Sequence, residues 1–147
     1  MKNKYIIVFS TALIIVLIDQ ITKFLIKANF QLGQSLPLIK NIFHLTYIHN
    51  FGAGFGILQQ KEWILVFISI IVIGAIFYYF DRIKDKEIFL QILVGFILGG
   101  TTGNLIDRVV YGFVVDFLDF RIWPVFNFAD SFVTIGVIGL IIYLWKK

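Results

Sequence analysis

The chain has 147 residues, of which 59% are apolar and only 15% charged, and its formal net charge is +4. Soluble domains carry about 25% charged residues and disordered chains are polar, so the composition excludes both classes and indicates a small integral membrane protein. The sequence has no Cys, which excludes disulfide frameworks, thiolate metal centres and cysteine nucleophiles, and its lysines are too scattered for a nucleic-acid-binding face.

A helix needs about 20 apolar residues to cross a bilayer. Four stretches of the chain meet this requirement, and we interpret residues 1–147 as one membrane-embedded domain. The first stretch follows basic residues, as in a secretory signal peptide, but three more stretches come later, so we expect it to remain as a helix. The expected spans are residues 5–26, 63–80, 88–106 and 128–145.

The connections between the spans predict the orientation of the chain. With four spans, both termini and the short link 81–87 lie on one side of the membrane, and the long connections 27–62 and 107–127 lie on the other. Basic residues are dense on the first side, so the positive-inside rule predicts cytoplasmic termini. The basic residues of that side are Lys2, Lys4, Arg82, Lys84, Lys86, Lys146 and Lys147.

Part of the first long connection has the composition of a β-strand. Residues 41–49 are rich in β-branched and aromatic side chains, which favours a short strand or hairpin. Because an open sheet edge cannot face lipid, we expect this segment to lie in the outer interface of the membrane.

Polar residues gather on the outer side of the predicted bundle, and ionisable residues inside membrane spans mark a functional site by default. Simpler interpretations also exist. Asp19 and Lys23, four residues apart, would form a pair on a helix surface, and Asp107 and Arg108 would form an interfacial ion pair. The gathered residues are Asp19, Lys23, Asn50, Asn104, Asp107, Arg108, Asp116, Asn127 and Asp130.

Simple interpretations exist for other polar residues as well. Asn127 and Asp130 suit the cap and the first turn of a helix, whatever else they do. Asp119 belongs to no further group of polar residues, and we expect it to be solvated. His44 and His49 have no third nitrogen ligand nearby in the sequence, so no metal site is predicted.

Paired aspartates are the chemistry that these residues best support. Two carboxylates that share one proton can hydrolyse a peptide bond, because the ionised one deprotonates a water while the protonated one polarises the carbonyl. Asp107, Asp116 and Asp130 all remain candidates on this argument. The rival interpretations are a proton-coupled transporter, which the acid-free inner halves of the spans disfavour, and a noncatalytic assembly subunit, which leaves the outer aspartates unexplained.

The polar residues lie in five short motifs. They are Asp19-Gln20-Ile21-Thr22-Lys23, Asn50-Phe51-Gly52-Ala53-Gly54-Phe55, Gly103-Asn104-Leu105-Ile106-Asp107-Arg108, Val114-Val115-Asp116-Phe117 and Phe126-Asn127-Phe128-Ala129-Asp130-Ser131. In this order they resemble the motifs of bacterial lipoprotein signal peptidase (signal peptidase II), a family of membrane aspartic peptidases. Each motif is weak alone, but five in order together with four spans are specific, and the resemblance covers nearly the whole chain.

The resemblance implies an all-α integral membrane protein of four transmembrane helices with a small extracytoplasmic β-cradle. It implies an endopeptidase that cleaves diacylglyceryl-modified prolipoproteins just before the lipidated cysteine, at the outer face of the bacterial cytoplasmic membrane. The expected partners are these prolipoproteins and membrane lipid. The enzyme is expected to act as a monomer, without nucleic acid, cofactor or metal.

The motifs also imply roles for individual residues. The catalytic pair of the family falls on Asp116 and Asp130, which decides against Asp107. The segment around Asn50 would clamp the substrate, with Phe51 and Phe55 near its lipid. The stretch between the two aspartates is shorter than in many relatives, with Arg121-Ile122-Trp123-Pro124 in place of a longer loop. The positions that match substrate-binding or supporting residues of the family are Asn50, Gly52, Asn104, Arg108, Asn127, Asp19 and Lys23.

Overall fold

The structure, a computed structural model, describes residues 3–53 and 57–147. Lys2, Gly54 and Phe55, which the sequence analysis named, lie outside the described residues. Within these described ranges, four helices are long and apolar enough to cross a membrane. They are α1 (Asn3–Asn29), α2 (Glu62–Tyr79), which the short 3₁₀ helix η2 (Phe80–Arg82) continues, α3 (Ile88–Tyr111) and α4 (Phe128–Trp145).

The four expected spans are therefore confirmed as helices, with two differences in their ends. α1 is longer than predicted at both ends, and α3 continues beyond residue 106 through Tyr111, with Asp107 and Arg108 on the helix. Gly112, with a φ of 76°, ends α3 in the left-handed conformation that glycine adopts without strain.

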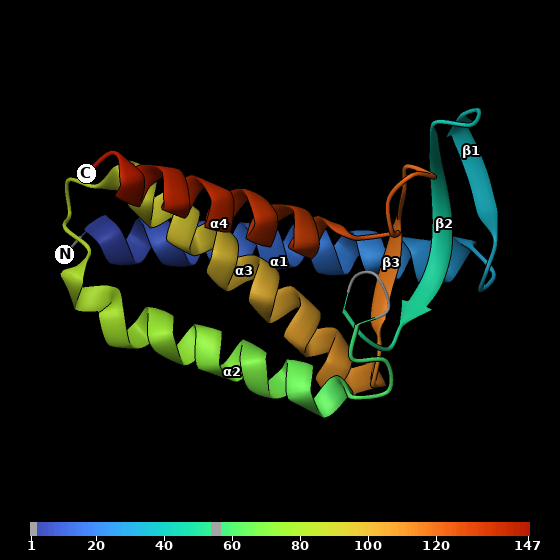
Figure 1. Cartoon of the computed structure of the whole chain (residues 1–147), viewed down its shortest axis with the longest axis horizontal. Coiled ribbons are helices and arrows are strands. Elements are labelled where there is room, and N and C mark those ends of the chain that lie inside the picture. The colour runs from blue at the N-terminus through green and yellow to red at the C-terminus, as the bar shows by residue number, and fades with distance from the viewer. Residues whose placement is uncertain (1–2, 54–56) are drawn as a thin grey trace.

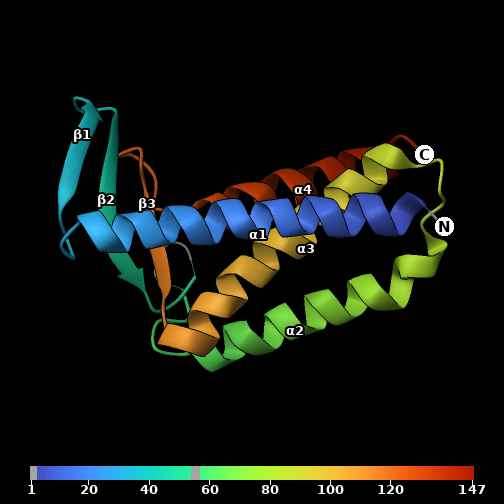
Figure 2. The same cartoon turned by 180° about the vertical axis from the view of Figure 1, so that it is seen from behind.

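α3 is the central helix of the bundle. Figures 1 and 2 show it crossing obliquely between α1 and α4 on one side and α2 on the other. Half of its residues are buried, whereas the only buried residue of α2 is Ser69. α2 therefore packs mainly against α3, and its remaining faces are apolar and exposed, as suits a helix that lies in lipid.

A small antiparallel sheet closes the end of the bundle opposite the chain termini (Figures 1 and 2). The strands are β1 (Ser35–Ile39), β2 (Phe43–Asn50) and β3 (Val114–Asp119), in the order β1-β2-β3. The predicted strand is confirmed as β2, but its hairpin partner β1 begins before residue 41. β3 was not predicted, since the segment that carries Asp116 was interpreted as a connection.

A buried lysine connects two segments at the end of the bundle that carries the chain termini. Lys4, near the start of α1, donates hydrogen bonds from Nζ to the carbonyl oxygens of Phe80 and Ile83 at 3.2 and 3.1 Å. These carbonyls end the α2–η2 helix, where a cation is favoured by the helix dipole. The contact joins the first helix to the turn between α2 and α3.

Candidate active site

The first predicted acid, Asp116, lies in the middle of β3 and is fully buried. The register of the sheet places it opposite Ile48 of β2. Two amide side chains donate to its two oxygens, Asn50 Nδ2 to Oδ2 at 2.8 Å and Asn127 Nδ2 to Oδ1 at 2.7 Å. Asn50 is the last residue of β2 and Asn127 precedes α4, so the sheet and the bundle meet at this carboxylate.

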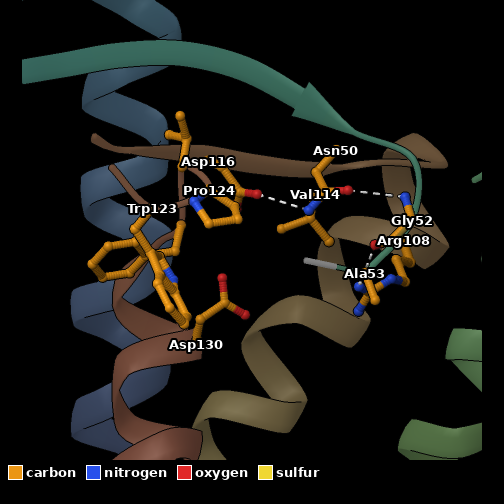
Figure 3. A pocket seen from close by; sticks show the side chains of 11 residues that line it. Asn50, Gly52, Ala53, Arg108, Val114, Asp116, Trp123, Pro124 and Asp130 are labelled. Atoms are coloured by element: carbon orange, nitrogen blue, oxygen red, sulfur yellow. Dashed lines mark hydrogen bonds between the residues drawn. The ribbon is translucent and has the colours of Figure 1, made fainter. Parts of the chain in front are cut away.

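Asn50 is held in its orientation by the turn that follows β2. The backbone N–H of Gly52 donates to Asn50 Oδ1 at 2.9 Å, which turns the amide nitrogen toward Asp116 (Figure 3). A Cβ on Gly52 would lie 2.6 Å from the carbonyl oxygen of Ile57, a distance that no side chain tolerates. The glycine of this motif is therefore needed so that the turn can close against the residues that follow it.

The second predicted acid, Asp130, lies in the first turn of α4. Its Oδ2 accepts a hydrogen bond from the backbone N–H of Asn127 at 3.2 Å, and its own N–H donates to Asn127 Oδ1 at 2.9 Å. This reciprocal pair is a capping box, so the prediction that Asn127 and Asp130 cap a helix is confirmed. Asp130 Oδ1 also accepts from Asn104 Nδ2 of α3 at 2.7 Å, which capping does not require.

Two asparagine amides connect the two acids. Asn127 Nδ2 donates to Asn104 Oδ1 at 3.0 Å as well as to Asp116, and Asn104 donates to Asp130. The hydrogen-bonded path from one carboxylate to the other thus runs through Asn127 and Asn104, which are both buried. The amide dipoles fix the directions of the carboxylates before any substrate arrives.

Asp116 and Asp130 open on one cavity of about 260 Å³ at the end of the bundle that carries the sheet (Figure 3). Arg108 borders it from α3 and donates from Nη2 to the carbonyl oxygen of Gly52 at 3.4 Å. Burial and the neighbouring Asp130 carboxylate raise the pKa of Asp116 to about 8. Among the other residues that line the cavity are Asn50, Ala53, Trp123 and Pro124.

A second cluster of charges lies behind the acids, around Lys23 of α1. Its ammonium contacts Asp19 Oδ2 at 2.7 Å and Asp107 Oδ2 at 3.0 Å, and it donates to Asn104 Oδ1 at 3.0 Å. Only 2% of the Lys23 side chain is exposed, and Asp19 and Asp107 are as deeply buried. The alternative of an Asp19–Lys23 pair on a helix surface is therefore wrong, because α3 covers this face of α1.

The two aspartates of this cluster hold the backbone beside each candidate catalytic acid. Asp107 Oδ2 accepts from the N–H of Val115, next to Asp116, and Asp19 Oδ1 accepts from the N–H of Ala129, next to Asp130, each at 3.0 Å. Lys23 thus ties together, through two carboxylates, the strand and the helix that carry the acids.

Gln20 completes the cluster and was not recognised as a site residue from the sequence. Its Nε2 donates to Asp107 Oδ1 at 2.9 Å and to Asp19 Oδ2 at 3.2 Å. The approach of α1 to α3 is close at this level, since a Cβ on Gly103 would lie 2.5 Å from Asp19 Oδ2. The only signal in the sequence was that Gln20 stands between Asp19 and Lys23 inside a membrane span.

Two expectations about other aspartates need correction. Asp107 does not form an ion pair with its neighbour Arg108 but with Lys23, and it is not among the residues that line the cavity. Asp119 is not solvated, since it is only 4% exposed, and it accepts hydrogen bonds from Thr46 and Arg121. Spacing along the chain does not indicate the contact with Thr46, because Thr46 lies on another strand of the sheet.

The chain was compared with known proteins. The family model described as signal peptidase (SPase) II matches residues 11–146. A lipoprotein signal peptidase from Halothermothrix orenii is 45% identical over 140 residues, which cover 95% of this chain and 96% of that one. A lipoprotein signal peptidase from Moorella thermoacetica is 46% identical, covering 88% of this chain and 86% of the relative.

A solved structure described as a bacterial membrane enzyme has the same fold, with a TM-score of 0.88. It is 38% identical to this protein, and the match covers 95% of this chain and 87% of that chain. The resemblance inferred from the five motifs is thereby confirmed over the length of the protein, and with it the fold class. The chain belongs to the signal peptidase II family of membrane peptidases.

Proposed function

We propose that Asp116 and Asp130 are the catalytic pair of an endopeptidase that removes the signal peptide of lipoproteins, cutting just before a diacylglyceryl-modified cysteine. The observation that carries the assignment is that both carboxylates open on one cavity and are joined through two asparagine amides. Asp107, the third candidate from the chemistry alone, has its oxygens occupied by Lys23, Gln20 and the N–H of Val115.

The two acids have different roles in this proposal. Asp130 lies in the first turn of α4, where the helix dipole favours negative charge, and Arg108 borders the same cavity. We assign Asp130 as the ionised member of the pair, which takes the proton of the attacking water. Asp116, with its raised pKa of about 8, holds the shared proton at neutral pH and donates it toward the scissile carbonyl oxygen.

The remaining polar residues of the cavity position the substrate and the acids. Asn50 and Asn127 orient Asp116, and Asn104 orients Asp130. Arg108 fixes the turn at Gly52 and presents a positive charge beside the cavity, where it can hold a carbonyl of the peptide. All of these side chains come from one chain, which supports action as a monomer.

The direct test uses purified protein and a precursor lipopeptide that carries the diacylglyceryl cysteine. We expect the product to be lighter than the precursor by the mass of the signal peptide, and the new N-terminus to be the modified cysteine. A precursor without the lipid is the matched control and should be cut far more slowly. Cleavage at another bond, or no cleavage of either substrate, would contradict the proposed function.

The shared proton predicts the pH dependence of the reaction. Above the pKa of about 8 both carboxylates are ionised and the acid is lost, so the rate falls as the pH rises through this value. The rate also falls at low pH, where a second proton removes the base. The measurement is kcat/KM against pH in detergent, since this ratio reports the free enzyme. An upper limb near pH 4, the value of an isolated Asp, would contradict the shared proton.

The same assay tests whether a metal takes part. In the parts of the chain that the structure describes, no group of three or more His, Asp or Glu residues is arranged to hold a metal ion. We therefore expect EDTA to leave the rate unchanged. Loss of activity with EDTA and its return with a divalent cation would make the aspartates metal ligands.

The orientation in the membrane is also a proposal, with both termini in the cytoplasm and the sheet outside the cytoplasmic membrane. It is supported by the basic residues gathered at the end of the bundle that carries the termini. A cysteine placed at Lys40 should be labelled by an impermeant thiol reagent in intact cells, and one at Lys84 should be labelled only after lysis. Both positions are exposed, and the protein has no Cys of its own. Labelling of Lys84→Cys in intact cells would reverse the orientation.

A further inference from the structure

Asp130 borders two grooves in addition to the cavity that it shares with Asp116. One groove, of about 270 Å³, lies between α2, α3 and α4 and includes Ser69, Thr101 and Val133. The other, of about 510 Å³, lies between α4 and the segment that follows β3. We call the second one the α4 groove. Its lining includes Phe120, Ile122, Trp123, Phe126, Ser131 and Ile135.

α4 is the partition between these two grooves. Asp130 and Thr134, one turn apart, line both grooves, while Val133 faces only the first and Ile135 only the α4 groove. Trp123 and Phe126 lie between the α4 groove and the cavity, since each of them lines both. Figure 3 shows the indole of Trp123 beside the carboxylate of Asp130. A branched substrate whose scissile bond lies at Asp130 can therefore place one branch in each groove, on either side of α4.

The two grooves differ in the chemistry of their linings. Asn104 and Arg108 bring amide and guanidinium groups to the first groove, and Thr101 adds a hydroxyl. Such groups match the carbonyl and N–H groups of an extended peptide, which must be satisfied when buried. Apart from Asp130, the α4 groove is built mainly from aromatic and aliphatic side chains, with only two hydroxyls. It matches a ligand without hydrogen-bond donors.

Two side chains in the wall of the α4 groove are highly exposed. Ile122 is 95% exposed and Trp123 is 58% exposed, although both are large and apolar. They lie beside α4, a membrane-spanning helix, near its outer end. Apolar residues and tryptophan in this position suit the boundary between lipid and water, so we place the mouth of the groove at this boundary.

We propose that the α4 groove binds an acyl chain of the diacylglyceryl group on the cysteine that follows the scissile bond, with Trp123 and Ile135 as its walls. The inference rests on the proposed function, because that function supplies a substrate with a lipid on this residue. The cysteine side chain leaves the backbone next to the scissile bond, so its lipid must enter a hollow that borders the catalytic cavity. The α4 groove adjoins the cavity, because Asp130, Trp123 and Phe126 line both.

The test narrows the groove and varies the acyl chain. Ile135→Trp should lower the ratio of kcat/KM for a dipalmitoyl substrate to that for a dibutyryl substrate by about tenfold or more, as expected when apolar groups of a ligand lose their pocket. Ile141→Trp, an equally exposed isoleucine on the same helix that is not part of the groove, should leave the ratio within about twofold of the unaltered enzyme. An unchanged ratio in Ile135→Trp would overturn the inference.

A second measurement does not depend on how the tryptophan variant folds. A dipalmitoyl substrate with a photoreactive diazirine in one acyl chain is bound to the Asp116→Asn protein and irradiated. We expect its adducts on residues 120–135, and adducts concentrated instead on α2 around residues 68–72 would overturn the inference. If the unaltered enzyme cleaves neither the dipalmitoyl nor the dibutyryl substrate, the proposed function itself fails.

Discussion

Asp116→Asn and Asp130→Asn are each expected to lower kcat/KM by at least about 10³-fold, since one carboxylate cannot serve as both acid and base. The substitutions keep the shape of the side chain, but the amide oxygen replaces only one of the two acceptor oxygens, and the amide nitrogen faces the other donor. We therefore expect a folded protein with a lower melting temperature, and a loss of rate that appears in kcat more than in KM. The measurement is cleavage of the lipidated precursor by purified variants, together with their thermal melting in detergent.

Asp119→Asn is the matched control for this experiment. Asp119 lies on the same strand as Asp116 and is also buried, but it bonds Thr46 and Arg121 and does not line the cavity. We expect its substitution to change the melting temperature while the rate stays within about threefold of the unaltered enzyme. A fully active Asp116→Asn protein would end the assignment of the pair.

The membrane-spanning part of the fold could be predicted because the bilayer imposes a length and a composition on each span. Residues 63–80 and 128–145 have the required length and composition whatever they pack against, and both segments are helical in the structure. The end of α3 could not be placed this way. Asp107 and Arg108 lie near that end and suggest by their charge that the span is over, but Asp107 pairs with the buried Lys23 and Arg108 lines the cavity.

The sheet was predicted only in part, because pairing between distant segments leaves little trace in one sequence. Residues 41–49 indicated a strand by composition, but the run Val114-Val115-Asp116-Phe117 has the same character and was interpreted as a connection. What makes it a strand is β2, whose residue Ile48 pairs with Asp116. The contact of Asn50 with Asp116 follows from this register and could not be derived from spacing along the chain.

The candidate site shows the same limit for side chains. Helical spacing predicts that Asp19 and Lys23 meet, and they do. It does not tell that α3 buries the pair or that Asp107 joins it. The chemistry alone could not choose between Asp107, Asp116 and Asp130. The resemblance chose the last two, and in the structure these two share a cavity while Asp107 supports the strand beside one of them.

Removal of the Lys23 ammonium is expected to damage both stability and catalysis. Lys23→Met keeps most of the length of the side chain but leaves Asp19 and Asp107 buried without their cation. Breaking a buried ion pair by removing one partner costs about 3–5 kcal/mol, so the melting temperature should fall by many degrees. kcat should fall as well, because these two carboxylates hold the N–H groups beside the catalytic acids.

Lys27→Met is the control, one turn further along α1. Lys27 lies over the ring of Tyr111 at 3.7 Å, and loss of such a contact costs only about 0.5–1 kcal/mol. A second control is the Lys23→Met/Asp107→Asn double variant. It removes one unpaired charge and should be more stable than Lys23→Met alone, so the two substitutions should be strongly non-additive. Additive losses would show that Lys23 and Asp107 do not act together.

The pH profile separates a positioning role of Lys23 from a purely structural one. The positive charge of Lys23 lowers the pKa of Asp116, against the larger opposing effects of burial and Asp130. Its removal therefore raises that pKa further, and the upper limb of the profile should move to higher pH in whatever fraction of Lys23→Met remains folded. A variant that was merely unstable would lose rate at every pH and keep the limb in place. An unshifted limb would mean that Lys23 supports the fold without reaching the acids through its charge.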